Sequence, residues 1–200
     1  MKQDREYRSM ELRVLEPDAE KKSFLVEGYA STFQTYVLFR SDDTDYCERI
    51  EPTAFDDADL SDVVFRVDHE GRVYARTSAG TVDLWTDEHG LAIKANLGKT
   101  QQARDLFEDI EAGNYPKMSF AFTVAEDHYD KATHTRVIDR VGKVYDVSPV
   151  SFPANPYTEL SVSTRDYFNG VIERERAERL ERERRERQKQ IIRILTEVTK

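Results

Sequence analysis

The sequence contains a single cysteine, Cys47, among its 200 residues, so it cannot form an intramolecular disulfide. Such sparing use of cysteine is typical of proteins in a reducing cytosol. Cys47 also lies between Asp45 and Glu48, and negative charges disfavour the thiolate that a nucleophile needs. The sequence therefore favours a structural thiol over a catalytic one.

Long apolar runs are also missing. No stretch approaches the about 20 consecutive apolar residues that a membrane-spanning helix needs. The first residues, Met1–Glu6, are mostly charged and contain no apolar segment of the kind found in secretory signals. We therefore expect an intracellular protein with no membrane partner.

The chain has no excess of positive charge. It carries 39 acidic and 30 basic residues, a net charge of −9. This balance argues against a dedicated nucleic-acid-binding protein, which usually presents a basic face. Hydrophobic residues make up 38% and charged residues 34%, and so low an apolar share predicts that part of the chain lies outside a packed core.

Residues 1–165 are expected to form one mainly β domain. Alternation of apolar and polar residues predicts strands at 23–33, 63–67, 73–77, 80–85, 91–97, 118–125, 136–141 and 144–152. A polar hairpin tip is expected at 126–135. One helix is predicted at 101–112, with Thr100 as its N-cap and Gly113 at its end. Gly90 is expected to adopt a positive φ in the turn before the strand at 91–97.

Residues 166–200 differ in character and predict a long charged C-terminal helix. Within Glu173–Gln190, Ala177 and Leu180 are the apolar interruptions in a run of acidic and basic residues. Acid–base pairs three and four residues apart support a helix even without a core behind it. Ile191–Val198 then carries an apolar stripe. Two interpretations remain open, a partner-docking arm and a solvated helix whose last turns fold back on the domain.

A serine, a histidine and an aspartate form the candidate catalytic set. Ser119 lies in the alternating run Pro116–Phe122, where a strand would point the serine into a cleft and its apolar neighbours into the core. His69 lies upstream, at the end of a predicted strand, and Asp146 lies downstream in another. A nucleophile, a base and a group that orients the base are what an acyl-transfer enzyme needs. Such a set is defined by geometry, so residue types alone also allow an ordinary strand serine.

Other polar residues give weaker candidates. A metal site would have to use four residues of the predicted hairpin tip, His128, His134, Asp127 and Asp130. Their spacing matches no strong zinc pattern, and we predict no metal and no cofactor. Ser148 and Ser151 are interpreted as strand serines, with Ser148 as a fallback nucleophile.

Several motifs together resemble the prohead maturation proteases of tailed phages and prophages, serine peptidases related in fold to the herpesvirus assemblin proteases. The resemblance covers residues 7–160. The motifs are, in chain order, Val26–Phe33, Glu48–Phe55, Val67–Glu70, Glu88–Leu91, Glu111–Phe122 and Asp146–Pro156. Each motif alone is weak, but their common order is specific.

The resemblance implies an α+β fold, an assemblin-like β-barrel flanked by helices. It also implies that Ser119 is the nucleophile and His69 the general base. Asp146 stands where the family usually has glutamate, and Thr53 and Ala121 replace two of its glycines. The shorter aspartate can still accept a hydrogen bond from the imidazole.

The function implied is a serine endopeptidase that processes scaffold protein and the major capsid protein inside the immature capsid, in the host cytoplasm. Self-cleavage is a further expectation. Because the related herpesvirus enzymes work as dimers, a homodimer is expected as well. The alternative is a non-catalytic assembly protein that docks on capsid or scaffold through its C-terminal arm.

Overall fold

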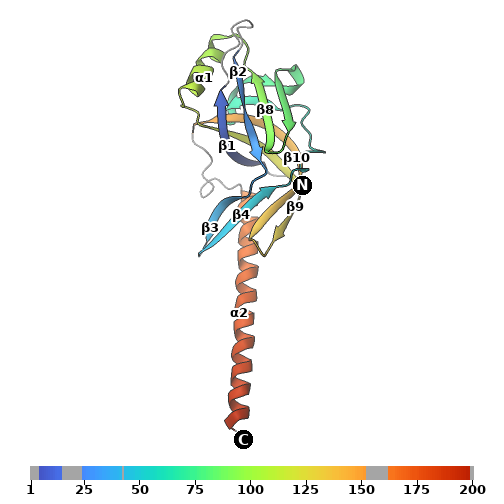
Figure 1. Ribbon diagram of the computed structural model, residues 1–200, viewed down its shortest axis with the longest axis vertical. Coiled ribbons are helices and arrows are strands. Elements are labelled where there is room, and N and C mark those ends of the chain that lie inside the picture. Colours follow the sequence, from blue (N-terminus) through green and yellow to red (C-terminus); the bar gives the residue numbers. More distant parts are fainter. Residues whose placement is uncertain (1–4, 15–23, 42, 152–161, 199–200) are drawn as a thin grey trace. The chain divides into compact units, whose positions relative to one another are not determined.

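The computed structural model describes residues 5–14, 24–41, 43–151 and 162–198. It divides into two compact units, residues 1–161 and residues 162–200. The described residues of the first unit are mainly β with one α-helix, and those of the second form a single long helix (Figure 1). The predicted fold class, mainly β with helices and a long C-terminal helix, is therefore confirmed. Of the described residues, none belongs to a helix that is both long and apolar enough to span a bilayer.

The described strands of the first unit form one ten-stranded sheet. Their bounds are β1 Glu6–Val14, β2 Leu25–Thr32, β3 Tyr36–Ser41, β4 Thr44–Ile50, β5 Val64–Val67, β6 Glu70–Arg76, β7 Val82–Thr86, β8 Gly90–Asn96, β9 Lys117–Asp130 and β10 Thr135–Val150. The main path runs β3-β4-β10-β9-β1-β2-β8-β7, and β5 and β6 branch from β10. No pairing closes this path into a barrel among the described strands.

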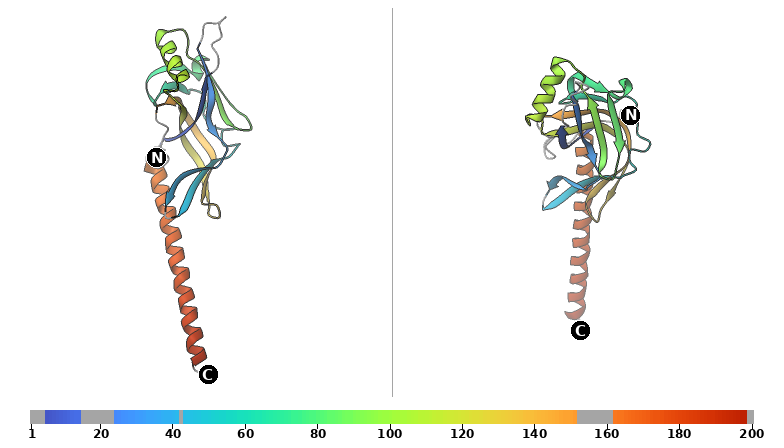
Figure 2. Two further views of the ribbon diagram at one scale, coloured as in Figure 1. Left: turned by 60° about the vertical axis from the view of Figure 1, so that its left-hand side comes forward. Right: turned by 45° about the horizontal axis from the view of Figure 1, so that its top comes forward.

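A long hairpin of β9 and β10 lies inside the sheet of the first unit, with β1 paired to β9 and β4 paired to β10 (Figure 2). The sequence predicted three shorter strands here, because the polar stretch after Val124 has no apolar alternation. The structure instead continues β9 to Asp130 and makes β10 one strand from Thr135 to Val150. Register shifts between Ile138 and Asp146 absorb the irregular pattern. Part of the last predicted strand, Phe152, lies outside the described residues.

One helix, α1 (Gln101–Glu111), packs against the sheet. Its apolar residues, Ala103, Leu106, Phe107 and Ile110, are buried in the common core. Thr100 Oγ1 accepts a hydrogen bond from the Ala103 N–H at 3.2 Å, and Gly113 follows with φ of 82°. Both predicted helix ends are thus confirmed.

Gly90 has a different role from the one predicted. It is not among the described residues with positive φ. A Cβ atom added at Gly90 would instead lie 1.9 Å from the Ser31 carbonyl oxygen. The glycine is therefore required by the close approach of β8 to β2, where Gly90 pairs with Thr32.

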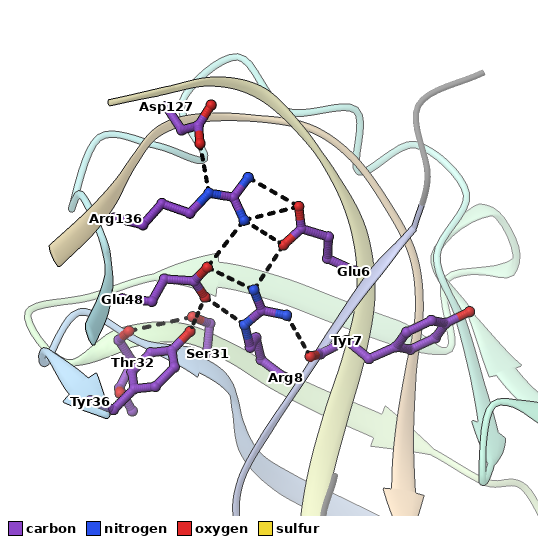
Figure 3. Close-up of polar contacts among 9 residues, drawn as sticks. All are labelled: Glu6, Tyr7, Arg8, Ser31, Thr32, Tyr36, Glu48, Asp127 and Arg136. Carbon is purple, nitrogen blue, oxygen red and sulfur yellow. Dashed lines mark hydrogen bonds and ion pairs between the residues drawn. The ribbon is translucent and has the colours of Figure 1, made fainter. Parts of the chain in front are cut away.

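A network of polar side chains, buried at its centre and partly buried at Tyr36 and Asp127, joins β1, β3, β4, β9 and β10 (Figure 3). Its members are Glu6, Arg8, Tyr36, Glu48, Asp127 and Arg136. Arg8 donates to Glu48 at 2.5 and 2.7 Å, and Arg136 donates to Glu6 at 2.9 Å. Burial is the largest single effect and lowers the pKa of Arg8, but Glu48, Tyr36 and Glu6 together outweigh it and raise that pKa well above its ordinary value. The network thus holds the N-terminal strand in the middle of the sheet.

The second unit is helix α2, Val162–Val198, which begins before the predicted residue 166. Its charged middle contains ion pairs at helical spacing, such as Glu181 with Arg185 at 2.5 Å. Near its end, four apolar side chains are exposed to solvent, Ile191, Ile192, Ile194 and Leu195.

Candidate active site

Strand β9 positions Ser119. Strand residues alternate between the two faces of a sheet, and on β9 Met118 and Phe120 point into the hydrophobic core. Ser119 therefore points to the opposite face, as the sequence predicted. Its exposed fraction is 1%.

A bulge in β10 places Asp146 on the same face as Ser119. Val144 pairs with Phe122, whereas Asp146 pairs with Ala121, so the register shifts at Tyr145. Without that shift, regular alternation would put Asp146 on the core face with Val144. The extra residue allows Val144 to be buried in the core while the Asp146 carboxylate faces the site.

His69 belongs to a two-residue turn between β5 and β6. Strand β5 runs parallel to β10, with Val64 paired to Asp146, so the turn lies beside the end of β10. Asp68 and His69 have φ of 45° and 59°, the pattern of a type I′ hairpin turn. Left-handed backbone costs non-glycine residues about 1 kcal/mol or more each, although aspartate and histidine occur there more often than most.

The three side chains form one hydrogen-bonded line. His69 Nε2 lies 2.8 Å from Ser119 Oγ, and His69 Nδ1 lies 2.6 Å from Asp146 Oδ1. An ionised carboxylate only accepts hydrogen bonds, so Nδ1 carries the proton and Nε2 accepts from the serine hydroxyl. This tautomer allows the imidazole to remove the proton from Ser119.

Two further side chains surround this line. Ser148 Oγ donates to Asp146 Oδ1 at 2.8 Å, and both residues are buried. The Tyr7 ring meets the His69 ring edge-on, with 4.6 Å between the ring centroids. The sequence predicts neither contact, because it indicates Ser148 only as a strand serine or a fallback nucleophile, and Tyr7 lies on a strand, β1, that the sequence does not indicate.

The structure does not bring the candidate metal ligands or Cys47 into this site. His128 bonds to Asp139 at 2.6 Å, and His134 contacts Tyr129 at 3.1 Å. Across the described parts of the chain, no three His, Cys, Asp or Glu residues gather in a way that could hold a metal ion. Cys47 is partly buried, and burial together with the charge of Asp45 raises the pKa of its thiol.

Comparison with known proteins shows similarity to a protein family and to a solved structure. The model of the Caudovirus prohead serine protease family matches residues 8–171. The structure of the bacteriophage T4 capsid assembly protease gp21 is similar with a TM-score of 0.48 and 13% identity, over 74% of this chain and 97% of that one. No curated protein matches the sequence significantly.

Proposed function

Because the chain belongs to the Caudovirus prohead serine protease family, we propose that it is a serine endopeptidase of phage capsid maturation with Ser119, His69 and Asp146 as its catalytic triad. The observation that carries this proposal is the hydrogen-bonded line from Ser119 Oγ through the His69 ring to Asp146 Oδ1. Nucleophile, base and orienting carboxylate are each within 2.8 Å of their neighbour, which is the reach that proton transfer requires.

Acylation follows from this geometry. Ser119 Oγ attacks the carbonyl carbon of the peptide bond while its proton passes to His69 Nε2. The imidazole becomes a cation at that moment, and the Asp146 carboxylate stabilises it through Nδ1. The peptide C–N bond then breaks as Nε2 returns the proton to the leaving amine, which leaves an acyl group on Ser119.

Water completes the reaction by the same route. His69 Nε2 removes a proton from a water molecule, whose oxygen attacks the acyl carbon. The bond to Ser119 Oγ then breaks and the serine regains its proton from His69. Side chains and water supply every proton and electron pair of both steps.

We assign the substrates by the family to which the chain belongs. They are scaffold protein and the major capsid protein, cleaved inside the immature capsid in the host cytoplasm. The protease domain is residues 1–165, and the arm at residues 166–200 docks on a partner. The exposed side chains of Ile191, Ile192, Ile194 and Leu195 support the docking role. The proposal also includes that the protease cleaves its own chain and that it forms a homodimer.

Two measurements on the full chain test the endopeptidase. Purified protein is treated with a fluorophosphonate, which labels an activated serine, and the labelled residue is located by peptide mass. The chain is also co-expressed with its capsid and scaffold partners, and the mass of each protein is followed over time. We expect labelling at Ser119 and cleavage of the partners, both absent in Ser119→Ala.

The control for these measurements is Ser61→Ala, which removes the exposed hydroxyl that bonds to Asp59 outside the proposed triad. This variant should be labelled and should cleave like the wild type. If the wild type and Ser119→Ala both assemble with the partners but neither is labelled nor cleaves, the chain is a docking assembly protein and not an enzyme.

A further inference from the structure

The turn that carries His69 is attached to the end of strand β10. The Asp68 N–H donates to the Pro149 carbonyl oxygen at 3.1 Å. In return, Asp68 Oδ1 accepts from the Ser151 N–H at 2.9 Å, and Ser151 Oγ lies 3.2 Å from both carboxylate oxygens. The residue next to the histidine thus makes backbone and side-chain contacts with a segment that is remote in sequence.

These contacts are unusual for an aspartate in a tight turn. Such side chains commonly bond to backbone two residues onward and so stabilise their own turn. The described partner of the Asp68 carboxylate is instead Ser151, 83 residues away. The contact therefore fixes the position of the turn relative to β10 in addition to its shape.

His69 needs such an anchor. Its turn connects β5 to β6, and β6 pairs only with β5 among the described strands. The imidazole must nevertheless lie between Ser119 on β9 and Asp146 on β10. Asp68 ties the turn to β10 directly after the residues of that strand, Asp146 and Ser148, that complete the site.

We propose that Asp68 is a positioning residue whose carboxylate, held by Ser151, fixes His69 between Ser119 and Asp146. The effect of Asp68 on catalysis rests on the proposed function, whereas its effect on the position of the His69 ring does not. Loss of the Asp68 carboxylate should let the turn move relative to β10, and the hydrogen bonds on both sides of the His69 ring should weaken together.

Two substitutions separate the conformation of the turn from the anchor. Glycine adopts a positive φ freely, so Asp68→Gly keeps the turn accessible while it removes the acceptor. Asparagine also tolerates positive φ and retains a carbonyl oxygen for the Ser151 N–H, so Asp68→Asn is the conservative rescue. A matched control is Asp130→Gly, which removes an aspartate that bonds Ala132 and Thr133 in the β9–β10 turn. That turn lies about 35 Å along β9 from Ser119.

The first readout is the set of ¹⁵N chemical shifts of the His69 ring, which report hydrogen bonding at each nitrogen without any substrate. The second is the rate at which a fluorophosphonate labels Ser119. We expect Asp68→Gly to shift both ring signals and to lower the labelling rate at least tenfold. Asp68→Asn loses one of the two carboxylate acceptors. Its labelling rate should remain within about threefold of the wild-type rate. Asp130→Gly should leave the ring signals and the rate unchanged.

Unchanged ring signals and labelling rate in Asp68→Gly would overturn the proposal, as would equal losses in Asp68→Gly and Asp130→Gly. If the wild type is not labelled, the proposed function fails, and the ring signals still decide the role of Asp68. If Asp68→Gly does not fold, Ser151→Pro replaces it, because proline removes both the N–H at 2.9 Å and the hydroxyl and leaves the turn sequence intact. We then expect shifted ring signals, and wild-type signals would contradict the anchor.

Discussion

Ser148 Oγ donates to Asp146 Oδ1 at 2.8 Å, and the same carboxylate oxygen lies 2.6 Å from His69 Nδ1. Two donors on one oxygen hold the plane of the carboxylate and therefore the orientation of the imidazole. The Ser148 hydroxyl proton is committed to Asp146, whereas the Ser119 hydroxyl faces the histidine. The geometry thus argues against Ser148 as a fallback nucleophile and for Ser148 as a support of the carboxylate.

Ser148→Ala is expected to slow fluorophosphonate labelling of Ser119 about tenfold, because one hydrogen bond to a charged group contributes about 1.5 kcal/mol. The label should still be found on Ser119 alone. Peptide mapping of the labelled protein checks both points. Complete loss of label in Ser148→Ala, with label retained in Ser119→Ala, would make Ser148 the nucleophile.

Asp146→Asn should lower the turnover of a cleaved partner by about 10³ to 10⁴-fold. The amide can present an N–H to the imidazole, which favours the tautomer that cannot accept the serine proton. Circular dichroism should show an unchanged fold, since the side chain keeps its size. Near-normal turnover would mean that another acidic residue orients the His69 imidazole, and Glu70 is the first residue to substitute.

Much of the sheet could be predicted because its strands have one apolar face. The predicted strand at 91–97 corresponds to β8, and its members of the hydrophobic core cluster, Leu91, Ile93 and Ala95, show the expected alternation. Strands β1 and β4 were missed for the opposite reason. Glu6, Arg8 and Glu48 are charged but buried, because each is paired within the polar network, and a hydrophobicity pattern cannot detect such residues.

The residue types of the candidate site could be predicted, but its geometry could not. A serine, a histidine and an aspartate were identified from their motifs, and the structure brings Ser119, His69 and Asp146 together. The bulge at Tyr145 decides which face Asp146 occupies, and it depends on pairing with β9. The contact between Asp68 and Ser151 joins distant segments, so no local pattern reveals it.

Glu48→Ala should lower the free energy of unfolding by about 3–5 kcal/mol, since it leaves Arg8 and Arg136 buried without a full set of partners. Urea denaturation followed by tryptophan fluorescence and circular dichroism measures the change. Asp45→Ala is the matched control, because Asp45 pairs with Arg40 at the exposed surface of the same β3–β4 hairpin. An equally small effect of both substitutions would mean that the network contributes little to stability.

Asp59 predicts a specific dependence of stability on pH. It accepts a hydrogen bond from Lys143 Nζ at 2.5 Å and from Ser61 Oγ at 2.6 Å, and these bonds lower the pKa of Asp59 well below its ordinary value. A lowered pKa in the folded state means that the unfolded chain binds the proton more readily. The stabilisation is therefore complete above about pH 5 and is lost as the pH falls through and below the ordinary value of about 4.

Asp59→Asn should melt at a lower temperature than the wild type at pH 7, and the difference should shrink progressively toward pH 3. Lys143→Met should reproduce most of this pattern, because it removes the main donor, and a difference in melting temperature that stays constant from pH 7 to pH 3 would contradict the assignment.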